Sequence, residues 1–204
     1  MSETPDLFAD KATDWDSMPI PAQISAGVSG AILEAVTLDP SWTVMDFGAG
    51  TGLICGALAP SVQRVLAVDI SASMLEKLAA KPELQGKVEV RCQDILSQPL
   101  GEQVDLVVSA MALHHVEDTG AALKALFEHL APGGRLALAD LDAEDGSFHP
   151  PGIEGVFHAG FGREALATRL LEAGFVEPSF RTACTLDKEG AAYPIFLVTA
   201  ARPQ

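Results

Sequence analysis

Residues 44–52, which read VMDFGAGTG, constrain the fold of this chain more than any other stretch. A short apolar run with one acid leads into three glycines spaced two apart, and an apolar helical pattern follows. Because glycine has no Cβ, its backbone can adopt positive φ and a ligand can approach the main chain closely. The stretch predicts a buried strand, a sharp turn and a helix. Ligands of open α/β sheets bind outside the carboxyl ends of the strands, so we expect a nucleotide site here.

The glycine spacing separates two kinds of nucleotide site. The dinucleotide fingerprint is G-x-G-x-x-G, whereas this chain has G-x-G-x-G with Asp46 before the first glycine. A carboxylate at Asp46 would repel a pyrophosphate, but it suits a ligand that carries an ammonium or sulfonium charge. A turn without any ligand is the remaining alternative.

The pattern resembles motif I of the class I S-adenosylmethionine-dependent methyltransferases, whose usual form is (D/E)-x-G-x-G-x-G. The resemblance implies that Asp46, Gly48, Ala49 and Gly50 bind this cofactor. The matching motifs span residues 44–140, and the nearest likeness is to the small-molecule branch that includes the ubiquinone and menaquinone biosynthesis methyltransferases.

Two acids after later strands complete the predicted cofactor site. Asp69 ends the next apolar run and can accept hydrogen bonds from ribose hydroxyls, and this role alone does not separate the cofactor from NAD. The run at residues 68–75 also matches the family. The resemblance then assigns cofactor contacts, above all to the adenine and the methionine part, to Ile70, Met74, Asp94, Ile95 and Ser109.

Strand and helix signals alternate from residue 42 onward, which is typical of a parallel sheet covered on both faces. We expect strands over 42–47, 64–69, 87–92, 104–110, 135–140, 176–185 and 192–201. The expected helices span 24–36, 52–60, 71–81, 119–130 and 162–173. The resemblance implies a Rossmann-like, seven-stranded, mostly parallel α/β sheet with helices on both faces and an antiparallel last strand.

Composition favours one globular domain: the 204 residues are 48% hydrophobic and 20% charged. We divide it into an N-terminal lid or helical segment, 1–40, and a Rossmann-like core, 41–204. A net charge of −15 disfavours nucleic acids and anionic membranes as partners and favours a small-molecule substrate. The acidic first residues, the lack of a long apolar run and three scattered cysteines favour a cytoplasmic location. Oligomeric state stays open.

Two segments are candidates for shaping the methyl-acceptor pocket. Residues 8–16, with Trp15, resemble the N-terminal lid of small-molecule methyltransferases, although the segment could simply dock on the core. Residues 141–160 have no clear period, and a loop of this length inside a compact domain is usually functional or mobile. We expect His149, Phe157 and His158 of this loop to border the acceptor.

His114 and His115 follow the fourth predicted strand and are candidates for a general base, which is needed only if the acceptor loses a proton. A paired histidine also occurs in this family as a structural feature, so that alternative stays open. The acids at 140–145 have no diagnostic ligand spacing, and we expect no metal.

The sequence therefore predicts S-adenosylmethionine-dependent methyl transfer to a small-molecule acceptor by in-line displacement. The alternatives are a protein of the same fold that binds the cofactor without catalysis and, less favoured, a nucleotide-dependent oxidoreductase.

Overall fold

A seven-stranded sheet organises the computed structural model, which describes residues 6–204; the first five residues of the predicted N-terminal segment lie outside the described residues. The strand order is β3-β2-β1-β4-β5-β7-β6. The first five strands pair in parallel, and β7 is antiparallel to both β5 and β6. The strands are β1 (Thr43–Phe47), β2 (Arg64–Asp69), β3 (Val88–Cys92), β4 (Val104–Ala110), β5 (Leu130–Leu141), β6 (Val176–Lys188) and β7 (Ala191–Ala201). The predicted fold class is confirmed.

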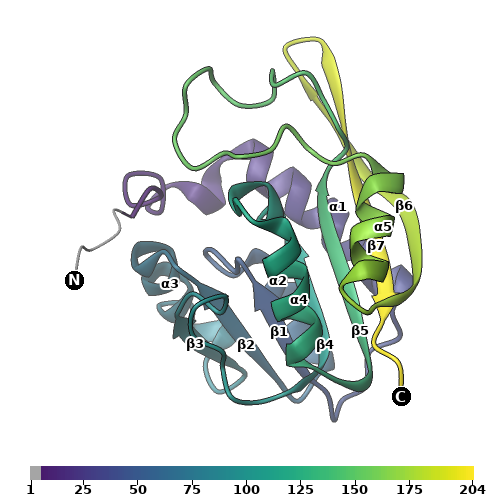
Figure 1. The fold of residues 1–204 in the computed structure, drawn as a ribbon. Coiled ribbons are helices and arrows are strands. Elements are labelled where there is room, and N and C mark those ends of the chain that lie inside the picture. The colour runs from purple at the N-terminus through teal and green to yellow at the C-terminus, as the bar shows by residue number, and fades with distance from the viewer. Residues whose placement is uncertain (1–5) are drawn as a thin grey trace.

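Helices cover both faces of this sheet because alternate strand residues point to opposite sides. One apolar cluster joins α1 (Pro19–Ala35), α2 (Leu53–Leu58) and α3 (Ala72–Ala79) to one face. A second cluster joins α4 (Thr119–His129) and α5 (Arg163–Glu172) to the other face. Figure 1 shows α4 and α5 in front of the sheet and α1 behind it. Within residues 6–204, no helix combines the length and apolar character that a membrane span requires.

Helix α1 begins at Pro19, earlier than the predicted start at residue 24. Proline usually interrupts a helix, so Pro19 and Pro21 favour a start after them in the sequence. Both prolines instead lie in the first turn, where the backbone N–H groups have no partner within the helix, so proline is tolerated there.

Strand β5 begins at Leu130 rather than at the predicted Arg135. Leu130 pairs with Val104, and the ladder resumes with Arg135 opposite Leu106, so residues 131–134 form an irregularity within the strand. Gly133 there has a φ of +78°, as in a turn, although the chain pairs with β4 on both sides of it.

The segment between β5 and α5 lacks helices and extended strands, as the sequence predicted for residues 141–160. The β6–β7 hairpin extends alongside this loop (Figure 1) and supports it. Lys188 donates to the carbonyl of Phe148 at 2.7 Å, and the hydroxyls of Ser147 and Tyr193 lie 2.8 Å apart. The loop is therefore held above the carboxyl edge of the sheet.

Candidate functional site

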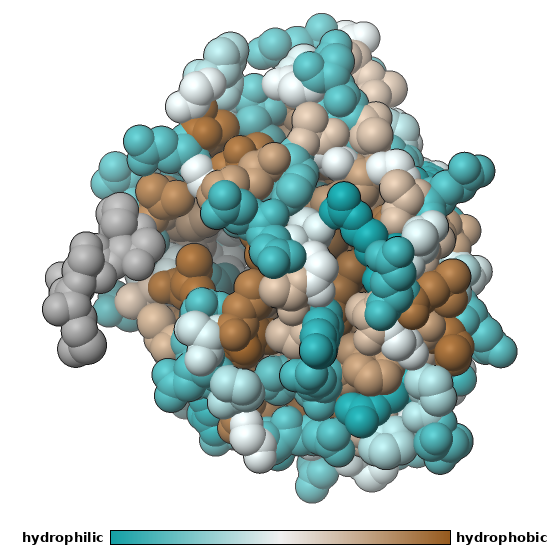
Figure 2. Space-filling view, in the orientation of Figure 1, coloured by the Kyte–Doolittle hydropathy of each residue, from teal (hydrophilic) through white to brown (hydrophobic). Residues whose placement is uncertain are grey.

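The glycine turn lies between β1 and α2 with its main chain open to a ligand. Gly48 and Ala49 both donate to the carbonyl of Val68, which ties the turn to β2. Gly48 and Gly50 have φ values of +72° and +53°. A Cβ at Gly50 would meet no atom within 4 Å, so one side of the main chain faces open space. In the orientation of Figure 1, Figure 2 shows a hollow in the region of this turn, bordered by several apolar side chains.

Asp69 joins the glycine turn to the start of α3. One carboxylate oxygen accepts the N–H of Gly50 and the other accepts the N–H of Ser71, each at 2.8 Å. Burial raises the pKa of Asp69, and the backbone N–H donors oppose that shift. Ser71 also caps α3, because its hydroxyl accepts the N–H of Met74. Ile70 next to Asp69 is 69% exposed, which is unusual for so large an apolar side chain.

The other predicted cofactor residues differ in their access to the surface. Asp94 is exposed and accepts the N–H of Leu96 at 2.9 Å. Ile95, by contrast, is buried in the core, as is Met74, so Leu96 rather than Ile95 presents apolar surface beside Asp94. Ser109 is buried and donates its hydroxyl to the carbonyl of Phe47. Its expected cofactor contact could therefore only be made through the backbone.

The N-terminal segment crosses the carboxyl edge of the sheet. Asp6 accepts hydrogen bonds from the hydroxyls of Ser71 and Ser73 and from the N–H of Ser73. Asp16 binds Lys81 at 2.6 Å and the hydroxyl of Thr51 in the glycine turn. The segment is thus attached on both sides of the open main chain.

Aromatic contacts connect the N-terminal segment to the histidines near the loop after β5. Phe8 contacts the rings of Trp15 and His115 edge-on, with centroids 6.0 Å and 5.3 Å apart. Trp15 is half-buried and Phe157 is 51% exposed. Phe8 thus joins the N-terminal segment to His115, near the side of the glycine turn on which the sequence predicts both cofactor and acceptor.

Three histidines and one acid gather beside the crevice. His114 and Asp140 are buried, and the His114 Nδ1 lies 2.7 Å from an Asp140 oxygen. The other Asp140 oxygen accepts the N–H of His114 at 3.1 Å. The His114 Nε2 lies 3.2 Å from the Nε2 of His149. The His115 Nδ1 lies 2.6 Å from the carbonyl of Gly155.

Burial keeps two of these histidines neutral at ordinary pH. Burial, reinforced by the charge of the neighbouring His114, lowers the pKa of His115 and that of His149 to about 4. Among residues 6–204, no three His, Cys, Asp or Glu side chains are arranged to hold a metal ion. Imidazole and carboxylate groups at these distances can exchange protons.

Comparison with known proteins decides the family. Residues 45–138 match the model of a methyltransferase domain. An uncharacterised methyltransferase of Schizosaccharomyces pombe is 33% identical over 58% of this chain and 47% of its own length. The malonyl-[acyl-carrier protein] O-methyltransferase of Halorhodospira halophila is 30% identical over 84% of this chain and 57% of its own length. The N-methyltransferase NodS of Bradyrhizobium japonicum, solved with S-adenosylhomocysteine, superimposes with a TM-score of 0.73 at 21% identity, covering 98% of this chain and 95% of NodS.

The chain belongs to the class I S-adenosylmethionine-dependent methyltransferase superfamily. It spans about half the length of the curated relatives that it matches. The narrower resemblance to quinone-biosynthesis methyltransferases is only loosely supported.

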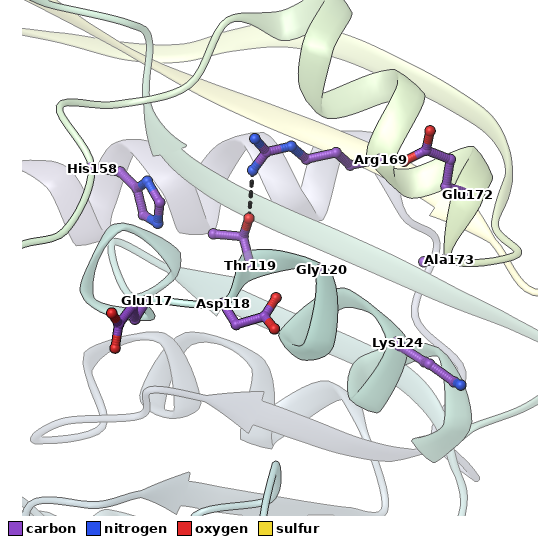
Figure 3. Close-up of a pocket in the computed structure, with 9 residues that line it drawn as sticks. All are labelled: Glu117, Asp118, Thr119, Gly120, Lys124, His158, Arg169, Glu172 and Ala173. Carbon is purple, nitrogen blue, oxygen red and sulfur yellow. Dashed lines mark hydrogen bonds between the residues drawn. The ribbon is translucent and has the colours of Figure 1, made fainter.

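The residues predicted to line the acceptor pocket do not all lie together. His149 belongs to the histidine cluster, whereas His158 binds the carbonyl of Val116 and lines a different cleft. That cleft, of about 530 Å³, lies between the start of α4 and α5 (Figure 3), and Arg169 donates to Thr119 across it. Its lining carries both charge signs, and His158 is the one predicted site residue in it.

Sequence reasoning missed two acids of the candidate site. The sequence groups Asp140 with the other acids at 140–145 and indicates no role for Asp6. An acid at the end of the apolar run 135–140 was a usable signal, because a buried carboxylate requires a partner. Nothing in the sequence around Asp6 indicated its contact with α3.

Asp46 lies under the glycine turn and is only 1% exposed. One of its oxygens accepts the thiol of Cys55 at 3.1 Å. The other oxygen, Oδ1, has no hydrogen-bond partner in the described part of the chain. Burial raises the pKa of Asp46 to about 7. An unpartnered buried acceptor at this position fits a ligand that brings positive charge to the turn.

The raised pKa of Asp46 predicts a pH dependence of stability. The folded protein binds this proton more tightly than the unfolded chain, whose carboxyl has an ordinary pKa of 3.8. The stabilisation is therefore fully present below about pH 4 and is lost as the pH rises through about 7. Relative to Asp46→Asn, the wild-type free energy of unfolding should fall by on the order of 3–4 kcal/mol across this range. Urea unfolding at several pH values measures it; parallel profiles for the two proteins would contradict the assignment.

Proposed function

We propose that this chain transfers the methyl group of S-adenosylmethionine to a small-molecule acceptor by in-line displacement. The observation that carries the proposal is the arrangement around Asp69, which fixes the glycine turn while leaving Gly50 open. Carboxylate oxygens each have two acceptor sites, so Asp69 can still accept two ribose hydroxyls. The buried, unpartnered Oδ1 of Asp46 also fits a cationic ligand.

The residues present suit each part of the cofactor. Ile70 offers exposed apolar surface to the adenine, and Asp94 lies exposed nearby to accept from its amine. When bound, the cofactor supplies an electrophilic methyl group whose sulfur leaves with the bonding electron pair. The protein then has to align the acceptor with that methyl and exclude water.

The N-terminal segment is suited to excluding water from the site. Asp6 bonds to α3, Asp16 bonds to Thr51 and Lys81, and Phe8 between them contacts Trp15 and His115, which supports a covering position for this segment. We assign it the role of a lid. The lid continues through the Phe8–His115 contact to the loop after β5, so cofactor and acceptor would be covered by one structure.

The acceptor and location are parts of the same proposal. A net charge of −15 favours a small molecule over a nucleic acid or an anionic membrane. The three cysteines are unpaired, which favours a reducing compartment such as the cytoplasm.

A calorimetric titration with S-adenosylmethionine, S-adenosylhomocysteine and NADH tests the cofactor. Binding of the first two alone is the expected result, and binding of NADH alone would favour an oxidoreductase and overturn the proposal. Release of S-adenosylhomocysteine in an acceptor screen then separates an enzyme from a protein of the same fold that only binds the cofactor.

A further inference from the structure

Asp140, His114 and His149 form a continuous chain of hydrogen-bonding groups. The acid and the first imidazole are buried, whereas His149 is half-buried. Their spacings of 2.7 Å and 3.2 Å are within hydrogen-bond range. Since Asp140 is an acceptor when ionised, it fixes the proton of His114 on Nδ1. The Nε2 of His114 is then an acceptor, and His149 donates to it from its own Nε2.

The chain ends at an accessible nitrogen. Within residues 6–204, nothing hydrogen-bonds the Nδ1 of His149. This atom is not enclosed either, because Asp46 Oδ1 is the one buried side-chain N or O atom without a partner in the described part. In the tautomer derived above, this nitrogen carries a lone pair and can take a proton from a molecule in the crevice.

The histidine cluster adjoins the cofactor half of the crevice. Ala112 packs against Gly48 so closely that a Cβ on this glycine would overlap it. His114 lies two residues further along the chain, in the short 3-10 helix Leu113–His115 that Ala112 precedes. The loop that carries His149 is fastened there as well, because Phe157 and His158 both donate to the carbonyl of His114.

We infer that Asp140, His114 and His149 form a proton relay, and that the methyl acceptor carries an ionisable O–H or N–H group. The inference deepens the proposed function and rests on it.

The acceptor atom bonds to the methyl carbon and loses its proton to the Nδ1 of His149. His149 passes its Nε2 proton to the Nε2 of His114, and the resulting imidazolium is stabilised by Asp140. The proton returns to water by the reverse route after product release. His149 would be a catalytic residue, and His114 and Asp140 act through it.

The charges around His149 support this direction of transfer. Burial, the other two histidines and Lys188 all lower its pKa, to about 4, and Glu144 opposes them. His149 is therefore neutral before the reaction and is a poor final site for the proton. His114 is the better site for the proton, because the carboxylate of Asp140, 2.7 Å away, stabilises its imidazolium form.

A spectroscopic test needs no acceptor. In ¹⁵N-histidine NMR of the full chain, we expect His114 as the Nδ1–H tautomer with a strongly downfield proton that Asp140→Asn removes. His149 should stay neutral between about pH 5.5 and 8. The buried His129, which bonds Ala125 and Leu100 elsewhere, is the internal control. An Nε2–H tautomer of His114 in the wild type would overturn the relay.

A kinetic test separates proton transfer from packing. S-adenosylhomocysteine release is followed with phenol and with 4-nitrophenol, which is already ionised at about pH 8.5. His149→Phe should lower turnover of phenol by about 10²–10³-fold and that of 4-nitrophenol by less than about threefold. Equal losses of turnover for both phenols would overturn the inference. So would a preference for a thioether probe, which needs no base, over every phenol and arylamine.

Matched controls keep the two proposals distinguishable. Asp105→Asn changes a half-buried acid that, like Asp140, accepts a backbone N–H, here that of Thr43 at 2.8 Å, at the opposite end of the sheet. This control should leave turnover unchanged, whereas Asp140→Asn should lower phenol turnover without changing S-adenosylmethionine affinity more than about twofold. Failure to bind S-adenosylmethionine would refute the proposed function whatever the histidine spectra show. Normal binding with the wrong His114 tautomer would refute the relay alone.

Discussion

Replacing Asp69 with alanine should weaken S-adenosylmethionine binding by about 10²–10⁴-fold. The expected reason is the loss of two hydrogen bonds from ribose hydroxyls to a charged acceptor, each contributing about 1.5–3 kcal/mol. The turn itself also loosens, since Gly50 and Ser71 both lose their acceptor. Calorimetric titration of the purified variant measures the affinity.

Two further variants show whether this loss of affinity comes from the carboxylate of Asp69. Asp69→Asn keeps the size and one acceptor oxygen, so its affinity should lie between those of the wild type and Asp69→Ala. Asp105→Asn should bind as the wild type does, because Asp105 bonds Thr43 far from the crevice. Circular dichroism and thermal unfolding verify that each variant is folded. A folded Asp69→Ala protein with unchanged affinity would remove Asp69 from the cofactor site.

The fold was predictable where local sequence decides the structure. Strand β4 occupies the predicted residues, because an apolar run bounded by polar residues is a buried strand with little alternative. One error lies where a tertiary contact decides, because Leu130 joins β5 only where Val104 lies opposite it. The other is local: α1 starts early because the first turn of a helix tolerates Pro19.

The candidate site also has a part that the sequence could predict and a part that it could not. The turn and Asp69 lie on consecutive elements of one β-α-β unit, so their meeting at one edge of the sheet follows from the chain order. The relay brings together Asp140, His114 and His149, which come from two strand ends and an irregular loop. Their pairing depends on where that loop settles, and the support of the β6–β7 hairpin through Lys188 has no local sequence signal.

Gly48→Ala should be the most damaging small substitution in the turn. At a φ of +72° a side chain costs about 1 kcal/mol in strain. The added Cβ also overlaps that of Ala112, and such overpacking costs about 1–3 kcal/mol. We expect urea denaturation to show a loss of about 2–4 kcal/mol, a large part of the stability of a typical domain. Gly30→Ala, in the middle of α1 with nothing near the added Cβ, should lose nothing.

Two companion variants separate stability from binding in this turn. In Gly48→Ala/Ala112→Gly the overlap is gone while the strain at positive φ stays, so about 1–3 kcal/mol should return. Gly50→Ala meets no protein atom, so it should cost only about 1 kcal/mol of strain. Its methyl group nevertheless points into the open space that we assign to the cofactor, and affinity should fall at least tenfold. If Gly50→Ala instead binds S-adenosylmethionine as the wild type does, the cofactor does not lie on this main chain. Because Gly48 faces protein and Gly50 faces open space, the same substitution at the two positions distinguishes a turn built for packing from one built to hold a ligand.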